Sequence, residues 1–144
     1  LTDLEAAVHK FQRSVDLTAK GHPDRAGHLQ NLAVSLTNQY QRLGSLNSLE
    51  AAVQVAQEAL DLTSEGDPDR ASRLQTLAVA FTDRYRRLGD LNDFESALCK
   101  TQAALELTPE GHPDRAGRFH SLAVSLRDRH RRSGDLSDLK AALQ

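Results

Sequence analysis

A six-residue phrase recurs along the chain at a constant step of 45 residues, and it constrains the fold more than any other feature. Gly-His-Pro-Asp-Arg-Ala stands at residues 21–26 and returns at 66–71, with Asp67 in place of histidine, and at 111–116. A second phrase, Leu-Thr-Asp-Leu-Glu-Ala-Ala at residues 1–7, follows the same step. Self-similarity at a fixed period of this length is the signature of a repeat array, in which each unit buries its apolar face against its neighbours.

Each unit predicts two amphipathic helices. In the first, over about residues 2–18, apolar residues recur at three- and four-residue steps, as they do on one face of a helix. The second, over about residues 23–43, has its apolar positions at Ala26, Leu29, Leu32, Ala33, Leu36, Tyr40 and Leu43. The third copy carries His130 and Ser133 at the last two positions, so we expect that end to be less well buried. With a shortened segment at 137–144, the chain is expected to hold seven helical segments in antiparallel neighbours.

Polar residues, prolines and glycines predict where these helices begin and end. We expect the first helix of each unit to follow a capping side chain, with a leucine just before the cap. The expected caps are Thr2, Asn47 and Asn92, and the expected leucines are Leu1, Leu46, Leu91 and Leu136. We expect these helices to end at Gly21, Gly66 and Gly111, and the second helices to end at Gly44, Gly89 and Gly134. The second helices are expected to begin at Pro23, Pro68 and Pro113, with His22, Asp67 and His112 as caps.

Composition excludes several classes of protein. The net charge of -2 gives no overall signature of polyanion binding, and no apolar run approaches the roughly 18 residues of a membrane span. We therefore expect neither nucleic acid nor a membrane as a partner. Cys99 is the single cysteine, which excludes an internal disulfide and indicates a reducing, cytoplasmic setting. The sequence has no Met and opens inside a repeat phrase, so we interpret it as a piece of a longer protein.

The repeat resembles a tetratricopeptide (TPR) repeat in a long-unit variant. Leu29, Leu32, Ala33 and Leu36 stand where that motif has Trp, Leu-Gly and Tyr; Gly44 matches its turn glycine; Ala52, Ala56, Ala59 and Leu60 fit its second helix; and Ser64 and Pro109 fall at its proline. The TPR unit has about 34 residues, so the unit of this chain is longer. The phrase at 107–116 is similar to fungal TPR-like arrays of the kinesin light-chain type.

The resemblance implies an all-α, right-handed superhelix, a solenoid of antiparallel TPR-like helix pairs. We expect one array over residues 1–144, with repeat phases 1–45, 46–90 and 91–135 and a partial unit at 136–144. The longer helices, which begin at the prolines, are expected to line the concave face.

That face is the predicted site for a protein or peptide partner, either an extended peptide or a partner helix. Its expected binding residues are Gln30, Asn38, Gln41, Gln75, Asp83, Arg86, His120, Arg127, Asp128 and Arg131. Val34, Val79 and Val124 recur on the same helices. We interpret them as packing against the adjacent pair; the alternative is an apolar floor of the binding face.

Two sets of basic residues have a structural and a functional interpretation. Arg25, Arg70 and Arg115 stand in a first helical turn, where the helix dipole disfavours a cation. Salt bridges to Asp16, Asp61 and Glu106 are the favoured explanation, and an acidic or phosphate ligand is the alternative. Clusters of basic residues end the second helices, at Arg84, Arg86 and Arg87 and at Arg127, Arg129, His130, Arg131 and Arg132. We interpret them as solvated helix ends, with an acidic partner or nucleic acid as the alternative.

The main alternative function is structural. The array is then a spacer or a self-association module in a larger protein, stacking end to end through apolar faces at Leu4, Val8, Phe11, Leu139 and Leu143. An enzyme is not expected, because the sequence has no phosphate-binding loop and no nucleophile motif. We expect no cofactor and no metal, because the six histidines lack a ligand spacing.

Overall fold

The computed structural model describes residues 2–133 and 141–144, and the described chain is an array of α-helices without a strand. Six helices have defined bounds: α1 (Asp3–Asp16), α2 (Arg25–Leu43), α3 (Leu46–Asp61), α4 (Arg70–Leu88), α5 (Leu91–Glu106) and α6 (Arg115–Ser133). Residues 141–143 are helical as well. The predicted seventh helix therefore lies mostly outside the described residues, as do Leu1, Gly134, Leu136 and Leu139.

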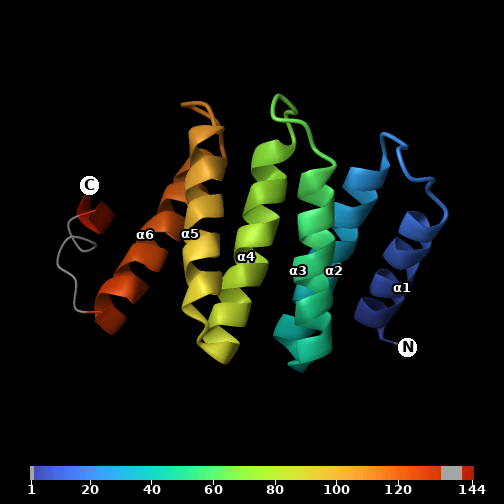
Figure 1. Cartoon of the computed structure of the whole chain (residues 1–144), viewed down its shortest axis with the longest axis horizontal. Helices are drawn as coiled ribbons and strands as arrows, with labels where there is room; N and C mark the ends of the chain where they lie inside the picture. The colour runs from blue at the N-terminus through green and yellow to red at the C-terminus, as the bar shows by residue number, and fades with distance from the viewer. Residues whose placement is uncertain (1, 134–140) are drawn as a thin grey trace.

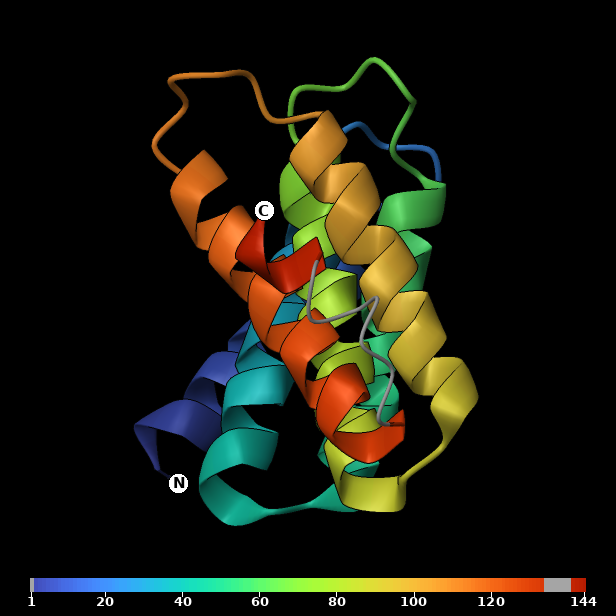
Figure 2. The ribbon, with the colours of Figure 1, turned by 90° about the vertical axis from the view of Figure 1, so that its left-hand side faces the viewer.

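The helices stand side by side in chain order, and each is antiparallel to the next (Figure 1). The closest neighbours are α2 with α3 and α4 with α5, and α3 also packs on α4. In addition α2 contacts α4 directly, so the longer helices form one layer and α3 and α5 lie on the other side. Figure 2 looks along the array, with α6 and α5 at the near end on opposite sides. This is the predicted TPR-like superhelix of helix pairs.

The core lies between the two layers and consists mainly of leucine and alanine. Leu29, Leu32, Leu49 and Leu77 are among the largest side chains that are fully buried, and Ala33 is buried beside them. Alanine on α3 and α5 lets the helices approach closely, because it adds little bulk between their axes. The predicted apolar stripe is confirmed over most of α2 and α4.

The ends of that stripe differ from the prediction. Leu43 and Leu88 are 59% and 54% exposed, so the stripe is not buried at the last position of either helix. On α6 the apolar stripe is exposed at the beginning of the helix, where Ala116 is exposed and Phe119 is 49% exposed. His130 is only half-buried, as expected, and the side chain of Ser133 lies outside the described residues.

Helix starts on the shorter helices confirm one cap and correct two. Thr2 accepts a hydrogen bond from the Glu5 N–H at 3.2 Å, as predicted. The caps of α3 and α5 are Ser45 and Asp90, which lie two residues before the expected Asn47 and Asn92. The leucines expected before those caps, Leu46 and Leu91, are the first residues of the helices.

Helix stops are confirmed for α2 and α4 and wrong for the short helices. Gly44 and Gly89 have φ of 72° and 76°, the left-handed conformation that ends α2 and α4. The short helices end earlier than predicted: α1 has its C-cap at Leu17, so Gly21, with φ 89°, turns the following loop instead.

The side chains predicted to cap the long helices close the turn before each helix instead, because the N-caps of α2 and α4 are Asp24 and Asp69. Nδ1 of His22 accepts from the Asp24 N–H at 3.0 Å, and Oδ1 of Asp67 accepts from the Asp69 N–H at 2.8 Å. His112 does the same for Asp114 at 3.1 Å. The predicted start of the long helices at the prolines is wrong, because each proline stands in this turn and the helix begins at the arginine two residues later.

That arginine holds the loop to the preceding helix. Nη1 of Arg25 donates to the carbonyl oxygens of Val15 and Thr18, at 3.1 and 2.8 Å. Arg70 binds the carbonyl oxygen of Thr63 at 2.7 Å, and Arg115 binds that of Thr108. The guanidinium thus lies at the negative end of the previous helix, where a cation is favoured.

The structural interpretation of these arginines is therefore supported, but the expected partners are wrong. Asp16, Asp61 and Glu106 are not the groups they bind, because the free carbonyls of the helix end lie nearer the guanidinium. Among the described residues, the carboxylate paired with Arg25 is that of Glu58, at 3.6 Å.

Candidate protein-binding face

The candidate site is the surface that α2, α4 and α6 present away from α3 and α5, called the concave face below. All ten predicted binding residues lie on these three helices. Six of the ten are exposed and four are half-buried, so none is buried in the core. Exposed members are Asn38, Gln41, Arg86, His120, Arg127 and Arg131, and half-buried members are Gln30, Gln75, Asp83 and Asp128.

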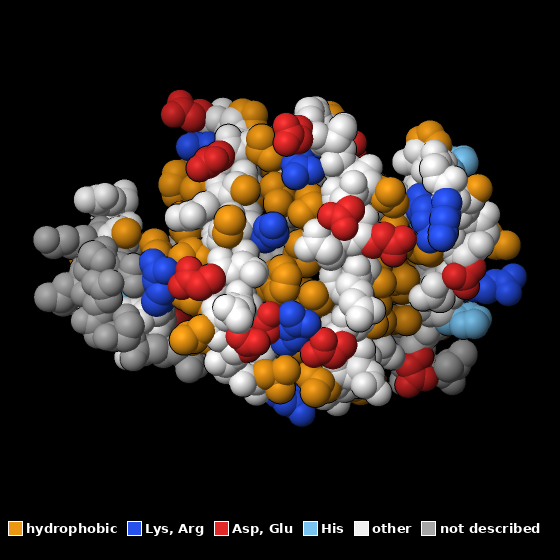
Figure 3. Space-filling view, in the orientation of Figure 1, with side chains coloured by type: hydrophobic (Ala, Val, Ile, Leu, Met, Phe, Trp, Pro, Cys, Tyr) orange, Lys and Arg blue, Asp and Glu red, His pale blue; other side chains and the backbone are white. Residues whose placement is uncertain are grey.

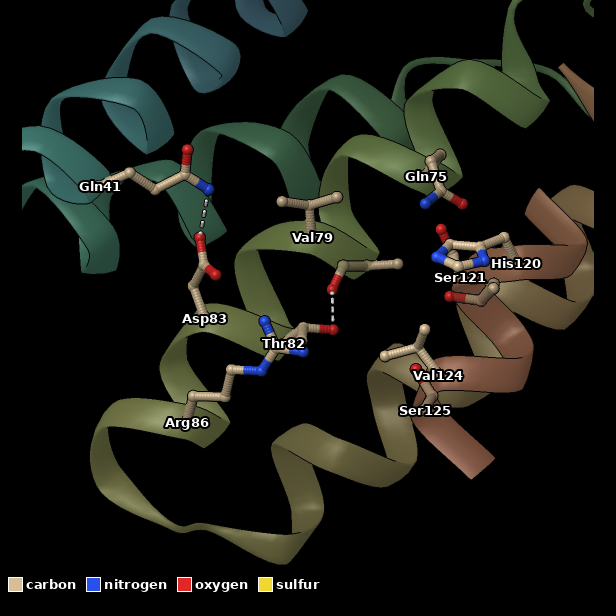
Figure 4. A pocket seen from close by; sticks show the side chains of 12 residues that line it. Gln41, Gln75, Val79, Thr82, Asp83, Arg86, His120, Ser121, Val124 and Ser125 are labelled. Atoms are coloured by element: carbon tan, nitrogen blue, oxygen red, sulfur yellow. Dashed lines mark hydrogen bonds between the residues drawn. The ribbon is translucent and has the colours of Figure 1, made fainter. Parts of the chain in front are cut away.

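Four of the predicted residues pair with one another across neighbouring units. Nε2 of Gln41 donates to Oδ2 of Asp83 at 3.0 Å, from α2 to α4 (Figure 4). One unit along, Nη2 of Arg86 lies 3.5 Å from Oδ2 of Asp128, from α4 to α6. The two pairs occupy equivalent positions of the repeat, so this contact recurs from unit to unit. It orients side chains that the sequence predicted for a ligand.

A second contact closes the junction between α2 and α4, the first junction below. Nε2 of Gln30 donates to Oγ of Ser72 at 2.9 Å, and Nε of Arg73 donates to Oε1 of Gln30 at 3.1 Å. Arg73 is buried, and its Nη1 also donates to Oγ1 of Thr63 at 2.9 Å. Asp67 and Asp69 lie within 3.9 and 3.6 Å of the same guanidinium. Both ends of the Gln30 amide are therefore bonded.

The equivalent contact is missing at the junction between α4 and α6, the second junction. Gln75 stands 45 residues after Gln30, but Gly117 replaces Ser72 there and offers no hydroxyl. Arg118 is directed to Oγ1 of Thr108 at 2.6 Å and to Asp114 at 3.8 Å. Within the described residues, Oε1 of Gln75 is buried without a hydrogen-bond partner.

Two adjoining cavities hollow the concave face at these junctions. One of about 310 Å³ lies between α4 and α6, and Figure 4 shows Gln75, Val79, His120 and Val124 around it. The other, of about 300 Å³, lies between α2 and α4 and includes Val34, Asn38 and Thr37 in its lining. Gln41, Gln75 and Val79 line both. Each is of the size that accepts one or two side chains of a ligand.

The three repeated valines form part of this lining. Val34 is 42% exposed and Val79 is 36% exposed, and Val124 is half-buried. The alternative interpretation, an apolar floor between polar side chains, agrees with the structure.

Most of the basic helix ends are engaged in internal contacts. Arg84 holds the carboxylate of Asp93 at two points, 2.8 and 2.7 Å, and Glu50 at 2.9 Å. These hydrogen bonds to Asp93 raise the pKa of the Arg84 guanidinium further above its ordinary value. Arg129 contacts Glu95 at 3.3 Å, and Arg87 donates to the Gly44 carbonyl at 3.3 Å.

Two cations remain available on this part of the concave face. Arg127 and Arg131 are exposed, and no ion pair or hydrogen bond holds their side chains in the described part of the chain. The side chain of Arg132 lies outside the described residues. Sequence reasoning had grouped Arg84 and Arg129 with them, whereas the structure separates paired from unpaired arginines.

Among the described residues, no group of three or more His, Cys, Asp or Glu side chains lies close enough together to hold a metal ion. No described helix is long and apolar enough to cross a bilayer. Cys99 is an exposed, free thiol on α5.

The layered helix pairs and the hollowed face define a helical-repeat scaffold. The family model Tetratricopeptide repeat matches two consecutive stretches, residues 25–69 and 70–114, each one 45-residue unit. The chain therefore belongs to the tetratricopeptide repeat family. Each match begins at the first residue of a long helix, α2 or α4, so the family unit is a long helix followed by a short one. A comparison with curated proteins finds no match.

Members of this family are generally protein-interaction modules and are typically non-enzymatic scaffolds. Binding to proteins or peptides is thus the general property of the family to which this chain belongs.

Proposed function

We propose that the chain binds a peptide or a partner helix along its concave face, as a scaffold without chemistry of its own. The observation that carries the proposal is the pair of adjoining cavities, which share Gln41, Gln75 and Val79. An exposed apolar floor bordered by hydrogen-bonding side chains is the usual composition of a ligand groove. Several such contacts along an array add to a useful affinity although each is weak.

The array is proposed to be one domain over residues 1–144 within a longer protein. We also propose a cytoplasmic setting, because the one thiol, Cys99, is exposed and unpaired. Neither a nucleic acid nor a membrane is part of the proposal. The arginines of the basic helix ends that are paired with Asp93, Glu50 and Glu95 support this choice, since paired cations attract phosphate weakly.

Affinity capture with three baits tests the proposal. The first is the wild-type chain, and the second carries Asn38→Lys and His120→Glu on the concave face. The third carries Gln54→Lys and Gln102→Glu, exposed positions of α3 and α5 on the opposite side. The proposal expects a protein that wild type and the third bait retain and the second bait loses. If all three baits retain the same proteins, the concave face is not the binding site.

Self-association is the second candidate function, and a specific surface favours it. A cavity of about 580 Å³ beside the first turn of α1 is lined by Leu4, Ala7 and the exposed Leu43. At the other end Phe119 of α6 is 49% exposed. Stacking of arrays is expected to give a mass that rises with concentration in light scattering, and Leu4→Glu or Phe119→Glu is expected to abolish the rise. A constant monomer mass over the accessible concentration range would exclude it.

A further inference from the structure

Equivalent glutamines at the two junctions differ in their contacts: the amide of the first is held by neighbouring side chains, and the amide of the second is not. The Gln30 amide is held at both ends by Ser72 and Arg73. Its equivalent, Gln75, has neither contact, and its Oε1 is buried without a donor. Rotation about the terminal side-chain torsion of glutamine is nearly free, so either end of this amide turns into the cavity at low cost. A buried acceptor without a donor is destabilising, and a ligand that supplies the donor relieves that cost.

A backbone peptide group is the natural complement of that amide. A glutamine side chain carries one acceptor and two donors in a plane, and a peptide unit presents one donor and one acceptor with similar spacing. The pairing does not depend on the ligand's side chain at that point. It requires a peptide unit whose N–H and C=O are not already used, as in an extended segment and unlike the interior of a helix.

Apolar contact is provided directly beside the amide. Val79 and Val124 flank the cavity of about 310 Å³ from α4 and α6. When an aliphatic side chain covers their methyl groups, the free energy of binding becomes more favourable by about 25 cal/mol for each Å² of apolar surface removed from water. Two polar residues, Ser121 and His120, also line this cavity.

Charge is provided further along the same face of α6. Arg127 and Arg131 follow Val124 at three and seven residues, so the three side chains share one face of the helix. Both arginines are exposed and without an ion pair within the described residues. The nearby carboxylate, Asp128, is already 3.5 Å from Arg86. An acidic side chain is therefore the favoured neighbour for this end of the face.

We propose that the second junction is the main binding site for an extended acidic segment of a partner protein. Its backbone pairs with the Gln75 amide, an aliphatic side chain packs on Val79 and Val124, and an acidic side chain reaches Arg127 and Arg131. The inference rests on the proposed concave-face function and adds the chemistry of the partner.

The spacing along the segment follows from helix and strand geometry. At 1.5 Å per residue, Arg127 and Arg131 lie roughly 5 and 10 Å along α6 from Val124. An extended chain advances about 3.3 Å per residue. The acidic residue is thus expected about two or three positions from the aliphatic one.

The probe is a display library of random peptides of about 12 residues, long enough to cross the face in extended form. It is selected on the 144-residue chain, and the affinity of one enriched peptide is then measured by fluorescence anisotropy. We expect enrichment of an aliphatic residue with an acidic residue two or three positions away. Arg127→Glu with Arg131→Glu is expected to weaken that peptide at least about ten-fold and to shift the selection toward basic peptides.

Two substitutions at the junction test the amide itself. Gln75→Leu removes it, and Gly117→Ser places a hydroxyl at the position that Ser72 occupies one unit earlier, where it competes for Gln75. A side chain fits there, since a Cβ on Gly117 meets nothing within 4 Å. Each is expected to weaken the peptide about three- to ten-fold, the worth of one hydrogen bond. Ser72→Ala is the matched control at the first junction, with less than about a two-fold effect.

The outcomes separate this inference from the broader proposal. Enriched peptides that bind all three second-junction variants as tightly as wild type, but are lost on Val34→Asp, overturn the inference and leave the concave face as the site. Enriched peptides insensitive to every concave-face substitution overturn both, and so does a library from which the folded chain enriches nothing. Far-ultraviolet circular dichroism of each variant confirms that a loss is not unfolding.

Discussion

Arg84 of α4 holds Asp93 of α5 through two parallel hydrogen bonds, Nε to Oδ2 at 2.8 Å and Nη2 to Oδ1 at 2.7 Å. Asp93 is 5% exposed, and Glu50 of α3 lies against the same guanidinium at 2.9 Å. One side chain of a long helix thus joins the short helices on both sides of it. Planar two-point pairing of this kind is specific to arginine, because lysine offers a single point charge.

Removal of the buried carboxylate is expected to destabilise the array. Asp93→Ala leaves Arg84 with Glu50 alone in a site only 22% exposed, and we expect a loss of roughly 2 kcal/mol in the free energy of unfolding. Urea denaturation measures it. Glu95→Ala is the control, since Glu95 is 61% exposed in its pair with Arg129 and is expected to contribute less than about 1 kcal/mol. Equal losses from the two variants would contradict the assignment.

This contribution is expected to persist into alkaline solution. The pKa of Arg84 is raised above its ordinary value, so the folded state favours the charged form. A raised pKa gives stability that is fully present below the unfolded-state pKa and is lost only as pH rises past it. The difference in stability between wild type and Asp93→Ala should therefore not fall between pH 8 and about 10, well below the ordinary arginine pKa.

The true caps of the short helices give a second prediction. Oγ of Ser45 and Oδ1 of Asp90 accept first-turn N–H groups of α3 and α5. Ser45→Ala and Asp90→Ala are each expected to cost about 1 kcal/mol in the free energy of unfolding. Asn47→Ala and Asn92→Ala, at the positions first expected to be caps, lie inside the helices and should be neutral or slightly stabilising. The reverse order of the two pairs would show that the helices begin later.

Two glycines of different conformation predict opposite effects of the same substitution. Gly44 has φ 72°, so Gly44→Ala forces a Cβ into the left-handed region and is expected to cost about 1 kcal/mol. Gly117 lies inside α6 with open space around it, so Gly117→Ala is expected to gain about 0.5 to 1 kcal/mol from helix propensity. Thermal denaturation of the two variants should shift in opposite directions. A fall in both would mean that the backbone of Gly117 is needed by a contact.

The sequence predicted the fold and which residues lie away from the core, because both follow from periodicity. Three- and four-residue steps fix which side of a helix is buried, and the residues left over, such as Asn38 and Arg86, must lie on another side. It failed where two candidates stood close together. Ser45 and Asn47 are both good caps, and only the backbone conformation around Leu46 decides between them.

The apolar periodicity also could not predict the contacts between units. Arg25 has acidic residues nearby in sequence, but the free carbonyls of Val15 and Thr18 bind it, because the loop places them against the guanidinium. The unpaired amide of Gln75 depends on how α6 lies relative to α4. One signal of this difference was available in the sequence. Gln30 and Gln75 are identical at equivalent positions of the repeat, but Gly117 stands at the position equivalent to Ser72.

The buried arginine of the first junction gives the last prediction. Arg73 is 8% exposed, and its Nη1 donates to the hydroxyl of Thr63, which in turn donates to the Ala59 carbonyl at 2.7 Å. Thr63→Val keeps the volume and removes the hydroxyl, so one donor of a buried cation loses its partner. We expect a loss of roughly 1 to 3 kcal/mol in the free energy of unfolding.

Thr76→Val is the matched control for that substitution. Within the described residues, the hydroxyl of Thr76 bonds only to the Ser72 carbonyl of its own helix, at 3.0 Å, and contacts no buried charge. Its removal should change the stability by less than about 0.5 kcal/mol. A double variant of Thr63→Val with Arg73→Leu is expected to lose less than the sum of the two single losses, because the two groups share one interaction. Full additivity would show that the hydroxyl stabilises the array independently of Arg73.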